Sequence, residues 1–460
     1  MASSSSAREV HVAWLICENK TSWLFPTRFD QPVSKPPLYH WTVCLVSRFF
    51  DKQPDIFIAR LVSLISLAAG IVFSLLCLNS LNFKSVMSTL LFFPIIDEAL
   101  DTKVDAFNFF MVWLCFYLYS KIPSFFMAFF LSFLLFFSKG LFSIFSFFFI
   151  VLALKRETSL IRTVTLGFVL GLPTLFFGIL NVGNTGTKWL VHETFIRFVG
   201  DGSINPSPFY YYFQKLLSYL PVNIALIYAA FCHKNLVNKR LFLWSMLFVF
   251  ILSLSYGKRA NYLLPIIPFM SLVCEESFRN LFQKLDLTRR RQTITFFRLT
   301  GIALFTLGLL YYFVVSLPLL IDYHRIDVIT TVFFNNQLYF FALFQWFLLS
   351  RILPMREIFR IFTCFPFLFI ILSTGKNIWE YQKKSVDLLV NFTRQNCDVL
   401  GVKKNPFDER IDILITLLRE NIINSSEYSK ANCILAPKDT VIEDHVKIYE
   451  EKEIAVFKKK

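Results

Sequence analysis

The chain consists of apolar runs separated by short polar segments, and this alternation extends from about residue 57 to residue 374. Runs such as 57–79, 161–183 and 297–321 approach or reach the ~20 residues that a helix needs to cross a bilayer. Shorter runs such as 123–137 repeat the same pattern. The pattern predicts about twelve membrane-spanning helices, at 57–79, 85–96, 105–119, 123–137, 141–154, 161–180, 216–232, 241–256, 262–275, 297–321, 336–350 and 358–374.

Two polar regions flank these runs and differ in character. Residues 1–56 precede the first run, and the tail from about 376 to 460 follows the last. In the tail, 409–422 has helical periodicity, whereas 431–437, 440–450 and 453–460 are typical of short strands. We therefore predict an all-α polytopic membrane domain over 57–375, preceded by an external segment at 1–56 that contains juxtamembrane helices. A small extramembrane α/β domain should follow at 376–460.

Composition agrees with a membrane protein, and the charge distribution indicates its orientation. Hydrophobic residues make up 55% of the chain and charged residues 17%, against about 45–50% and 25% in soluble domains. The net charge of +15 would suggest nucleic acid as a partner of a soluble protein. Here the basic residues lie between apolar runs, and retention of these loops in the cytoplasm explains them better. They occupy 155–162, 233–240, 279–298 and 351–360.

If the spans alternate, the opposite face carries residues 1–56, 97–104, 138–140, 181–215, 257–262 and the tail. The N-terminus is then external, yet residues 1–20 lack a basic segment followed by an apolar core. We therefore expect one further spanning helix upstream of Met1. The nine cysteines have no metal-ligand spacing, so we predict that they are core residues. Cys397 and Cys433 are candidates for a disulfide in an oxidising compartment.

Unusual charged residues collect on the external face. Lys35 precedes Pro36 and Pro37 in the stretch KPPLYHW. On its own this pattern is typical of a lysine that reaches to the membrane surface beside a helix breaker. Asp105 begins an apolar run, where a carboxylate is costly without a partner. Both positions are candidates for a binding site, against the simpler interpretation as solvated loop residues.

The loop at 188–213 and the stretch at 256–268 add further candidates. His192, Glu193 and Arg197 lie within two helical turns, and arginine can bind a phosphate with a planar fork. The alternative is an amphipathic helix at the membrane interface. In YGKRANYLLPIIP, Lys258 ends one span and Tyr262 begins the next. The prolines that follow interrupt the span, and broken helices at membrane depth tend to line cavities.

These stretches resemble, in order, the motifs of a known superfamily. SWLFPTRFDQPVSKPPLYHW (22–41) is similar to its "dWl.P…KPPLyyW" motif, and IARLVSL (58–64), TKVDAFNFF (102–110) and SKGLFSIFSFF (138–148) resemble the motifs that follow. Two further matches to motifs of this superfamily are HETFIRF followed by PFYYYFQKLLSYLP, and KRANYLLPIIP. The resemblance covers about 7–275. In this region the chain resembles bacterial members of the protein O-mannosyltransferase and lipid A aminoarabinose transferase superfamily. These proteins have the C-type glycosyltransferase fold.

The resemblance implies a function and roles for the matching residues. Members transfer a sugar, with inversion, from undecaprenyl or dolichyl phosphate to a lipid, glycan or protein hydroxyl. For this chain that implies a bacterial inner (plasma) membrane and an active site facing the periplasm. No cofactor is implied, and whether a divalent metal binds stays open. The matching positions assign the donor to Lys35, Lys139, His192, Arg197, Lys258 and Tyr262, and a second catalytic carboxylate to Asp105.

The family's catalytic carboxylate is where the chain departs from the pattern. Counting back the family's spacing from Trp23 and Pro26 leads to Ser6 and Ala7, and Glu9 is the nearest carboxylate. Either the missing aspartate lies upstream of Met1, which we favour, or Glu9 replaces it, or the protein is inactive. The alternative from another class is a transporter or flippase for a lipid-linked saccharide. Because transporters carry polar residues near mid-span and the charges here lie in loops, we favour the transferase.

Overall fold

The structure is a computed structural model of the chain. It describes residues 4–24, 26–28, 31–33, 35–90, 92, 95, 104–154, 160–180, 207–217, 226–227, 229–231, 238–283 and the strand segments 400–402, 422–423, 433–437, 445–451 and 454–459. His192, Arg197 and the spans predicted at 297–321, 336–350 and 358–374 lie outside these residues, as does 409–421 of the helix predicted at 409–422.

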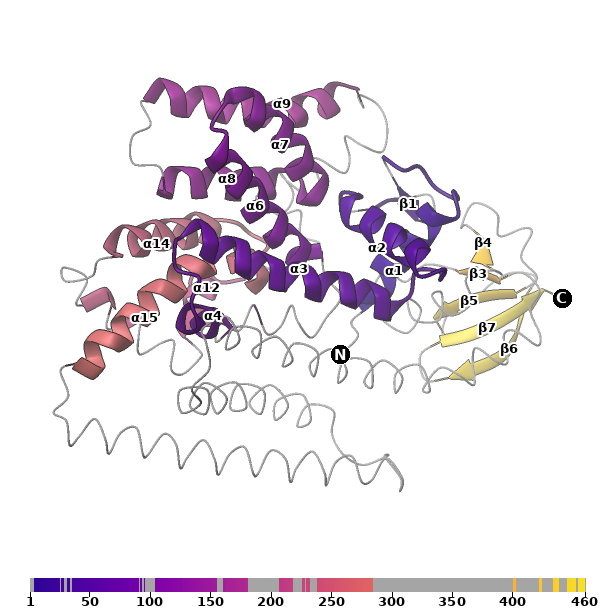
Figure 1. The fold of residues 1–460 in the computed structure, drawn as a ribbon. Helices are drawn as coiled ribbons and strands as arrows, with labels where there is room; N and C mark the ends of the chain where they lie inside the picture. Colours follow the sequence, from indigo (N-terminus) through magenta and orange to yellow (C-terminus); the bar gives the residue numbers. More distant parts are fainter. Residues whose placement is uncertain are drawn as a thin grey trace.

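The N-terminal region contains two helices that pack against the first long apolar helix (Figure 1). They are α1 (Ser4–Cys17) and α2 (Leu38–Phe49), joined through a short antiparallel pair, β1 (Thr27–Arg28) and β2 (Gln31–Pro32). Pro37 is the N-cap of α2, as expected for a residue that fixes φ at the start of a helix. The apolar helix α3 (Ile56–Cys77) begins where the Asp55 carboxylate accepts a hydrogen bond from Ile58 N–H at 2.7 Å.

The helices that follow form the main bundle. They are α4 (Phe83–Leu90), α6 (Val104–Lys121), α7 (Phe125–Lys139), α8 (Leu141–Leu154) and α9 (Leu160–Leu180), then α12 (Tyr211–Leu217), α14 (Lys239–Ser253), the 3-10 helix η3 (Ala260–Ile266) and α15 (Ile267–Gln283). Most of the corresponding predictions agree within a few residues. The interruption predicted near Pro265 is η3, which continues directly into α15. The helix predicted at 85–96 extends only to Leu90 in α4, and most of 216–232 is not described.

Within the described helices, α3 alone is long and apolar enough to cross a bilayer by length and composition. Shorter apolar helices occupy Phe125–Lys139, Leu141–Leu154 and Ile161–Phe176. Large apolar side chains remain exposed on α7 and α9, including Phe126, Phe130, Ile161 and Phe168. Exposed apolar patches of this kind mark surfaces that contact lipid or another protein.

Close packing of α3 on α6 fixes the position of the candidate site. A Cβ atom added at Gly70 of α3 would lie 2.5 Å from Phe109 Cδ1 of α6, so a larger residue there would push the helices apart. The side chains of Trp113 and Phe109, which belong to α6, are fully buried in the hydrophobic core. The first turn of α6, which carries Asp105, is thereby held beside α3 and η3.

The C-terminal strands form one mixed sheet with the order β4-β3-β5-β7-β6. Its strands are β3 (Leu400–Val402), β4 (Ile422–Ile423), β5 (Cys433–Pro437), β6 (His445–Glu451) and β7 (Ile454–Lys459). The last three fall in the segments predicted as strands. Since β3 and β4 run parallel, their connection must cross over, and it contains 409–421 of the predicted helix 409–422. The last residue of that prediction, Ile422, is the first residue of β4. The α/β organisation of the whole domain stays a prediction, because that connection is outside the described residues.

Candidate functional site

Glu9 lies at the centre of a buried polar cluster in the N-terminal region. Its side chain is 2% exposed, and its Oε1 atom accepts a hydrogen bond from Lys35 Nζ at 2.9 Å. His40 Nε2 lies 2.8 Å from the other oxygen, Oε2. The half-exposed guanidinium of Arg8 is 3.5 Å from Oε1. Both carboxylate oxygens of Glu9 are therefore engaged, by groups from α1, the loop before α2, and α2.

Burial alone would raise the pKa of Glu9, but the surrounding positive charge reverses this. The ammonium of Lys35, the hydrogen bond with His40 and the guanidinium of Arg8 hold the pKa of Glu9 well below its usual range. Burial lowers the pKa of Lys35, and repulsion from Arg8 and Arg259 adds to this, although the Glu9 carboxylate opposes the change. Glu9 is consequently ionised at neutral pH.

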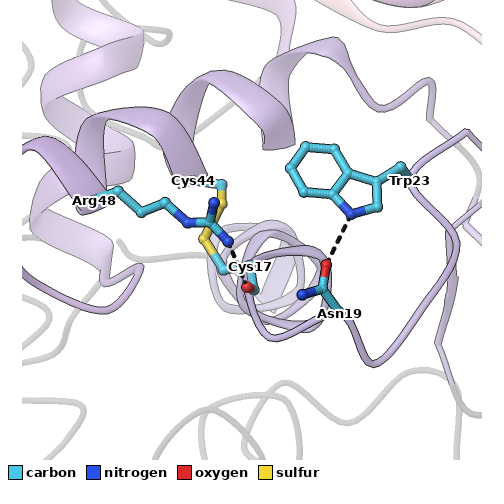
Figure 2. Close-up of a disulfide and its surroundings, with 5 residues drawn as sticks. All are labelled: Cys17, Asn19, Trp23, Cys44 and Arg48. Carbon is cyan, nitrogen blue, oxygen red and sulfur yellow. Dashed lines mark hydrogen bonds between the residues drawn. A yellow bond between two sulfur atoms is a disulfide. The ribbon is translucent and has the colours of Figure 1, made fainter.

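A disulfide between Cys17 and Cys44 joins α1 to α2 (Figure 2), with a Cα–Cα distance of 5.5 Å. This pairing was not predicted from the sequence, because residues 27 positions apart become neighbours only when the two helices pack. Cys115 and Cys274 are free and buried, as predicted for core cysteines. Next to the disulfide, Arg48 donates a hydrogen bond to the Cys17 carbonyl at 2.9 Å. The helix that carries Glu9 is thus covalently joined to the helix that carries His40.

A second polar cluster forms where α6, α7 and η3 meet. Asp105, in the first turn of α6, forms an ion pair with Lys139, the last residue of α7. The Lys139 ammonium also lies 4.3 Å from the ring centroid of Tyr262 and 4.6 Å from that of Phe142. Gly140 follows with a φ of 65°, which only glycine adopts readily, so the chain turns sharply into α8 immediately after Lys139. Asp105 therefore has the partner that its apolar setting requires.

A buried network of small polar side chains supports the end of α7. Asn108 Oδ1 on α6 accepts hydrogen bonds from Ser138 at 3.2 Å and from Ser143 at 2.5 Å. The two serine hydroxyls lie 3.0 Å apart, on either side of the turn at Gly140. Because satisfied buried networks are rigid, this one holds the backbone at Lys139 against α6.

The two clusters lie on elements that contact each other. The rings of Tyr39 and Phe107, on α2 and α6, are 5.9 Å apart, and Trp41 on α2 is 5.6 Å from Phe137 on α7. Arg259 is near enough to Lys35 to act on its charge, and it immediately precedes η3, which carries Tyr262. The structure thus forms two clusters, Glu9 with Lys35 and Asp105 with Lys139 and Tyr262, on elements that contact each other.

The structure distinguishes two adjacent cations that the sequence presents alike. Lys258 Nζ donates hydrogen bonds to the Ser207 carbonyl at 3.0 Å and to the Ser255 carbonyl, so it ties two backbone segments together. Arg259 has an exposed side chain, and its backbone N–H donates to Tyr212 Oη at 3.3 Å. Sequence reasoning selected Lys258 and missed Arg259, Arg8 and His40. Arg8 is adjacent to Glu9 in the sequence. The contact of His40 with Glu9, 31 positions away, and the effect of Arg259 on Lys35 arise from tertiary packing, for which the sequence contains no local signal.

No group of three or more metal-ligating side chains that could hold an ion occurs among the residues that the structure describes.

Comparison with models of protein families finds no match, and no curated protein sequence matches the chain. Two solved structures are similar to it, both crystal structures of ArnT from Cupriavidus metallidurans. The one bound to undecaprenyl phosphate gives a TM-score of 0.62 at 13% sequence identity, covering 98% of this chain and 93% of ArnT. The apo structure gives 0.63 at 14% identity, covering 98% and 92%.

The chain therefore has the C-type glycosyltransferase fold of ArnT, as the resemblance in sequence predicts. This fold and the apolar helices together indicate an integral membrane protein. The number of spanning helices stays a prediction, because several of the expected spans lie outside the described residues.

Proposed function

We propose that this protein transfers a sugar from a polyprenyl-phosphate donor to a hydroxyl group of a lipid, glycan or protein acceptor, with inversion of the anomeric carbon. The observation that carries the proposal is the pairing of two buried carboxylates with two lysines in adjacent clusters, Glu9 with Lys35 and Asp105 with Lys139. These clusters belong to a fold in which ArnT has been seen bound to undecaprenyl phosphate. Cations and a carboxylate base are the groups that such a displacement requires.

The cations have the task of stabilising the leaving group. As the bond from the anomeric carbon to the phosphate oxygen breaks, negative charge builds on the departing polyprenyl phosphate. Lys35, which is buried, and Lys139, which is partly buried, are the ammonium groups of the two clusters, and the exposed guanidinium of Arg259 adds positive charge that acts on Lys35. The motif resemblance adds Arg197 to this set. Lys258 is bound to backbone carbonyls, so we assign it to holding the loop before η3.

Glu9 is the carboxylate best placed to accept the proton of the acceptor hydroxyl. Three interpretations of the family's catalytic aspartate were open, and the burial and pairing of Glu9 favour the one in which Glu9 replaces it. In the proposed step the acceptor oxygen attacks the anomeric carbon while its proton passes to Glu9. The phosphate leaves from the opposite side with the bonding electron pair. Asp105 then serves as a second carboxylate that holds Lys139.

The disulfide supports the proposed orientation. Disulfides persist in oxidising compartments and are rare in the cytosol. Cys17 and Cys44 both lie in the region that the basic loops place on the external face. We therefore propose that the site faces the non-cytoplasmic side, which in a bacterial inner membrane is the periplasm.

Release of polyprenyl phosphate by the purified full chain, with undecaprenyl-phosphate sugars and a panel of acceptors, tests the function. Arg197→Ala should lower the rate about 10²- to 10³-fold, the usual cost of losing a contact to developing charge. Arg197→Lys should be intermediate, because lysine keeps the charge but loses the two-pronged grip. Lys84→Met, at an exposed position of α4, is the matched control and should leave the rate unchanged.

A protein that binds the donor lipid but yields neither free polyprenyl phosphate nor a glycosylated acceptor would refute the transferase. Transport or flipping of a lipid-linked saccharide would then be the better assignment.

A further inference from the structure

His40 is a fully buried histidine at a position where the resembled motif has tyrosine. It lies on α2, two residues after Leu38, where the motif reads KPPLyyW and this chain has KPPLYHW. Its Nε2 atom is 2.8 Å from Glu9 Oε2, and the two residues are 31 positions apart. A tyrosine in this place would have no ring nitrogen to offer. The contact is therefore a property of this chain, separate from the motif that surrounds it.

The state of Glu9 determines which ring nitrogen carries the hydrogen. An ionised carboxylate is only an acceptor, so a nitrogen 2.8 Å from Glu9 Oε2 must be the donor. The neutral form of His40 is then the one with hydrogen on Nε2. Its Nδ1 atom is buried and makes no hydrogen bond to any described group. A second proton can therefore enter the ring only at Nδ1.

We propose that His40 is a positioning residue that makes the catalytic base sensitive to pH. Neutral His40 fixes the Glu9 carboxylate through its Nε2–H, and a second proton at Nδ1 converts it into a further cation that weakens Glu9 as a base. This inference rests on the proposed role of Glu9 in accepting the acceptor proton. In each turnover the acceptor O–H bond breaks, its proton moves to Glu9, and His40 keeps its Nε2 hydrogen throughout.

Glu9 is already surrounded by positive charge, and this is why another cation matters. Lys35 and Arg8 contact its carboxylate, and Arg259 lies near Lys35. A nearby positive charge favours the ionised form of a carboxylate and so reduces its tendency to take up a proton. Other charged or titratable residues on the elements packed against α1 and α2 are His11 on α1, Arg60 on α3 and Lys139 on α7.

Substitutions that differ in reach and in charge test this role. In His40→Gln the side-chain amide can still donate to Glu9 Oε2, but it cannot take up a proton. We expect the turnover rate of His40→Gln to stay within about threefold of the wild type at pH 8. His40→Asn is too short to reach, and His40→Phe has no donor. Both should lose about 10- to 100-fold, the cost of a hydrogen bond to a charged group.

The dependence on pH separates this role from a purely structural one. Between pH 8 and pH 5 the wild-type rate should fall about tenfold or more, because the added positive charge on His40 weakens Glu9 as a base. His40→Gln should lack this fall. The control is His11→Gln, which changes another buried histidine of α1, stacked on Trp14 at 5.8 Å, and should retain the fall. An unchanged acid fall in His40→Gln, or equal activity of the Gln and Asn variants, would overturn the inference.

Nitrogen-15 NMR of histidine-labelled protein in detergent gives a second readout that needs no activity. The His40 signals are those that disappear in His40→Gln. At pH 8 they should show hydrogen on Nε2, and Glu9→Gln should change them, whereas hydrogen on Nδ1 would refute the inference directly. If the wild type releases no polyprenyl phosphate while the NMR result is as expected, the proposed function is lost and the coupling of His40 to Glu9 stands.

Discussion

The two buried carboxylates of this protein each pair with a lysine, but their surroundings differ. Glu9 uses both oxygens, one toward Lys35 and the other toward His40. Asp105 forms its ion pair with Lys139, and that ammonium also lies against two aromatic rings. The first cluster is built from α1, α2 and the loop before α2, and a disulfide joins α1 to α2. The second is built between α6, α7 and η3 in the main bundle.

This difference suggests a division of tasks. A lysine over aromatic faces retains favourable interactions when its carboxylate partner is exchanged for a phosphate, because the rings attract the cation in either case. Lys139 is therefore suited to hold the donor phosphate. Glu9 has several donors around one carboxylate, an arrangement that fixes a base in position. Glu9 should thus govern the chemical step, whereas Asp105 should mainly govern how Lys139 is held.

The largest expected effect compares the two carboxylates directly. Glu9→Gln should lower the single-turnover rate about 10²- to 10⁴-fold, because a general base contributes that much. Asp105→Asn should lower it by no more than about tenfold, since the amide still has an oxygen that can accept a hydrogen bond from Lys139. Rapid-quench measurement at saturating donor checks both. Equal losses, or a larger loss for Asp105→Asn, would contradict the roles that we assign to the two clusters.

The next largest effect is expected from removing the disulfide, which should disturb the first cluster more than the second. Removing a disulfide typically costs about 2–4 kcal/mol of stability. In the double variant Cys17→Ser with Cys44→Ser, we expect α1 to loosen from α2 and the transfer rate to fall about tenfold, because Glu9 loses its fixed position. Donor affinity, to which Lys139 of the second cluster also contributes, should change less than the transfer rate.

Cys77→Ser, which replaces a free cysteine of α3, is the control. A reducing agent should affect the wild type and this control but not the double variant. Full activity in the double variant would show that the disulfide is not needed to place Glu9.

The smallest effect concerns stability in acid. The pKa of Glu9 is lower in the folded protein than in the unfolded chain, so the stability that it contributes is fully present above the unfolded value, about 4.3. That stability is lost as the pH falls through the lower folded value. The difference in unfolding temperature between the wild type and Glu9→Gln should therefore be constant from pH 7 to about pH 5 and narrow below pH 4. Thermal unfolding in detergent measures it, and a difference that widens in acid would contradict the assigned direction.

Local rules determined much of the fold. Continuous apolar runs predicted α3, α6, α7, α8, α9 and α14, because a helix at membrane depth must satisfy its own backbone and present apolar side chains. Gly140 lies in the predicted turn at 138–140, between α7 and α8. Pro36 and Pro37 were interpreted as a helix breaker, and the structure instead begins α2 directly after them. The motif resemblance predicted a fold that the likeness to ArnT confirms. Each of these signals depends on residues close together in the sequence.

Tertiary structure alone decided the partners within the site. Glu9 and Lys35 are 26 positions apart, Glu9 and His40 are 31 apart, and Asp105 and Lys139 are 34 apart. Nothing in the sequence near Cys17 indicates Cys44, and nothing near Lys258 indicates that it binds backbone carbonyls while the side chain of Arg259 is exposed. The energy of a charged or covalent pair depends on distance and burial. Both are fixed only when helices far apart in the chain pack together.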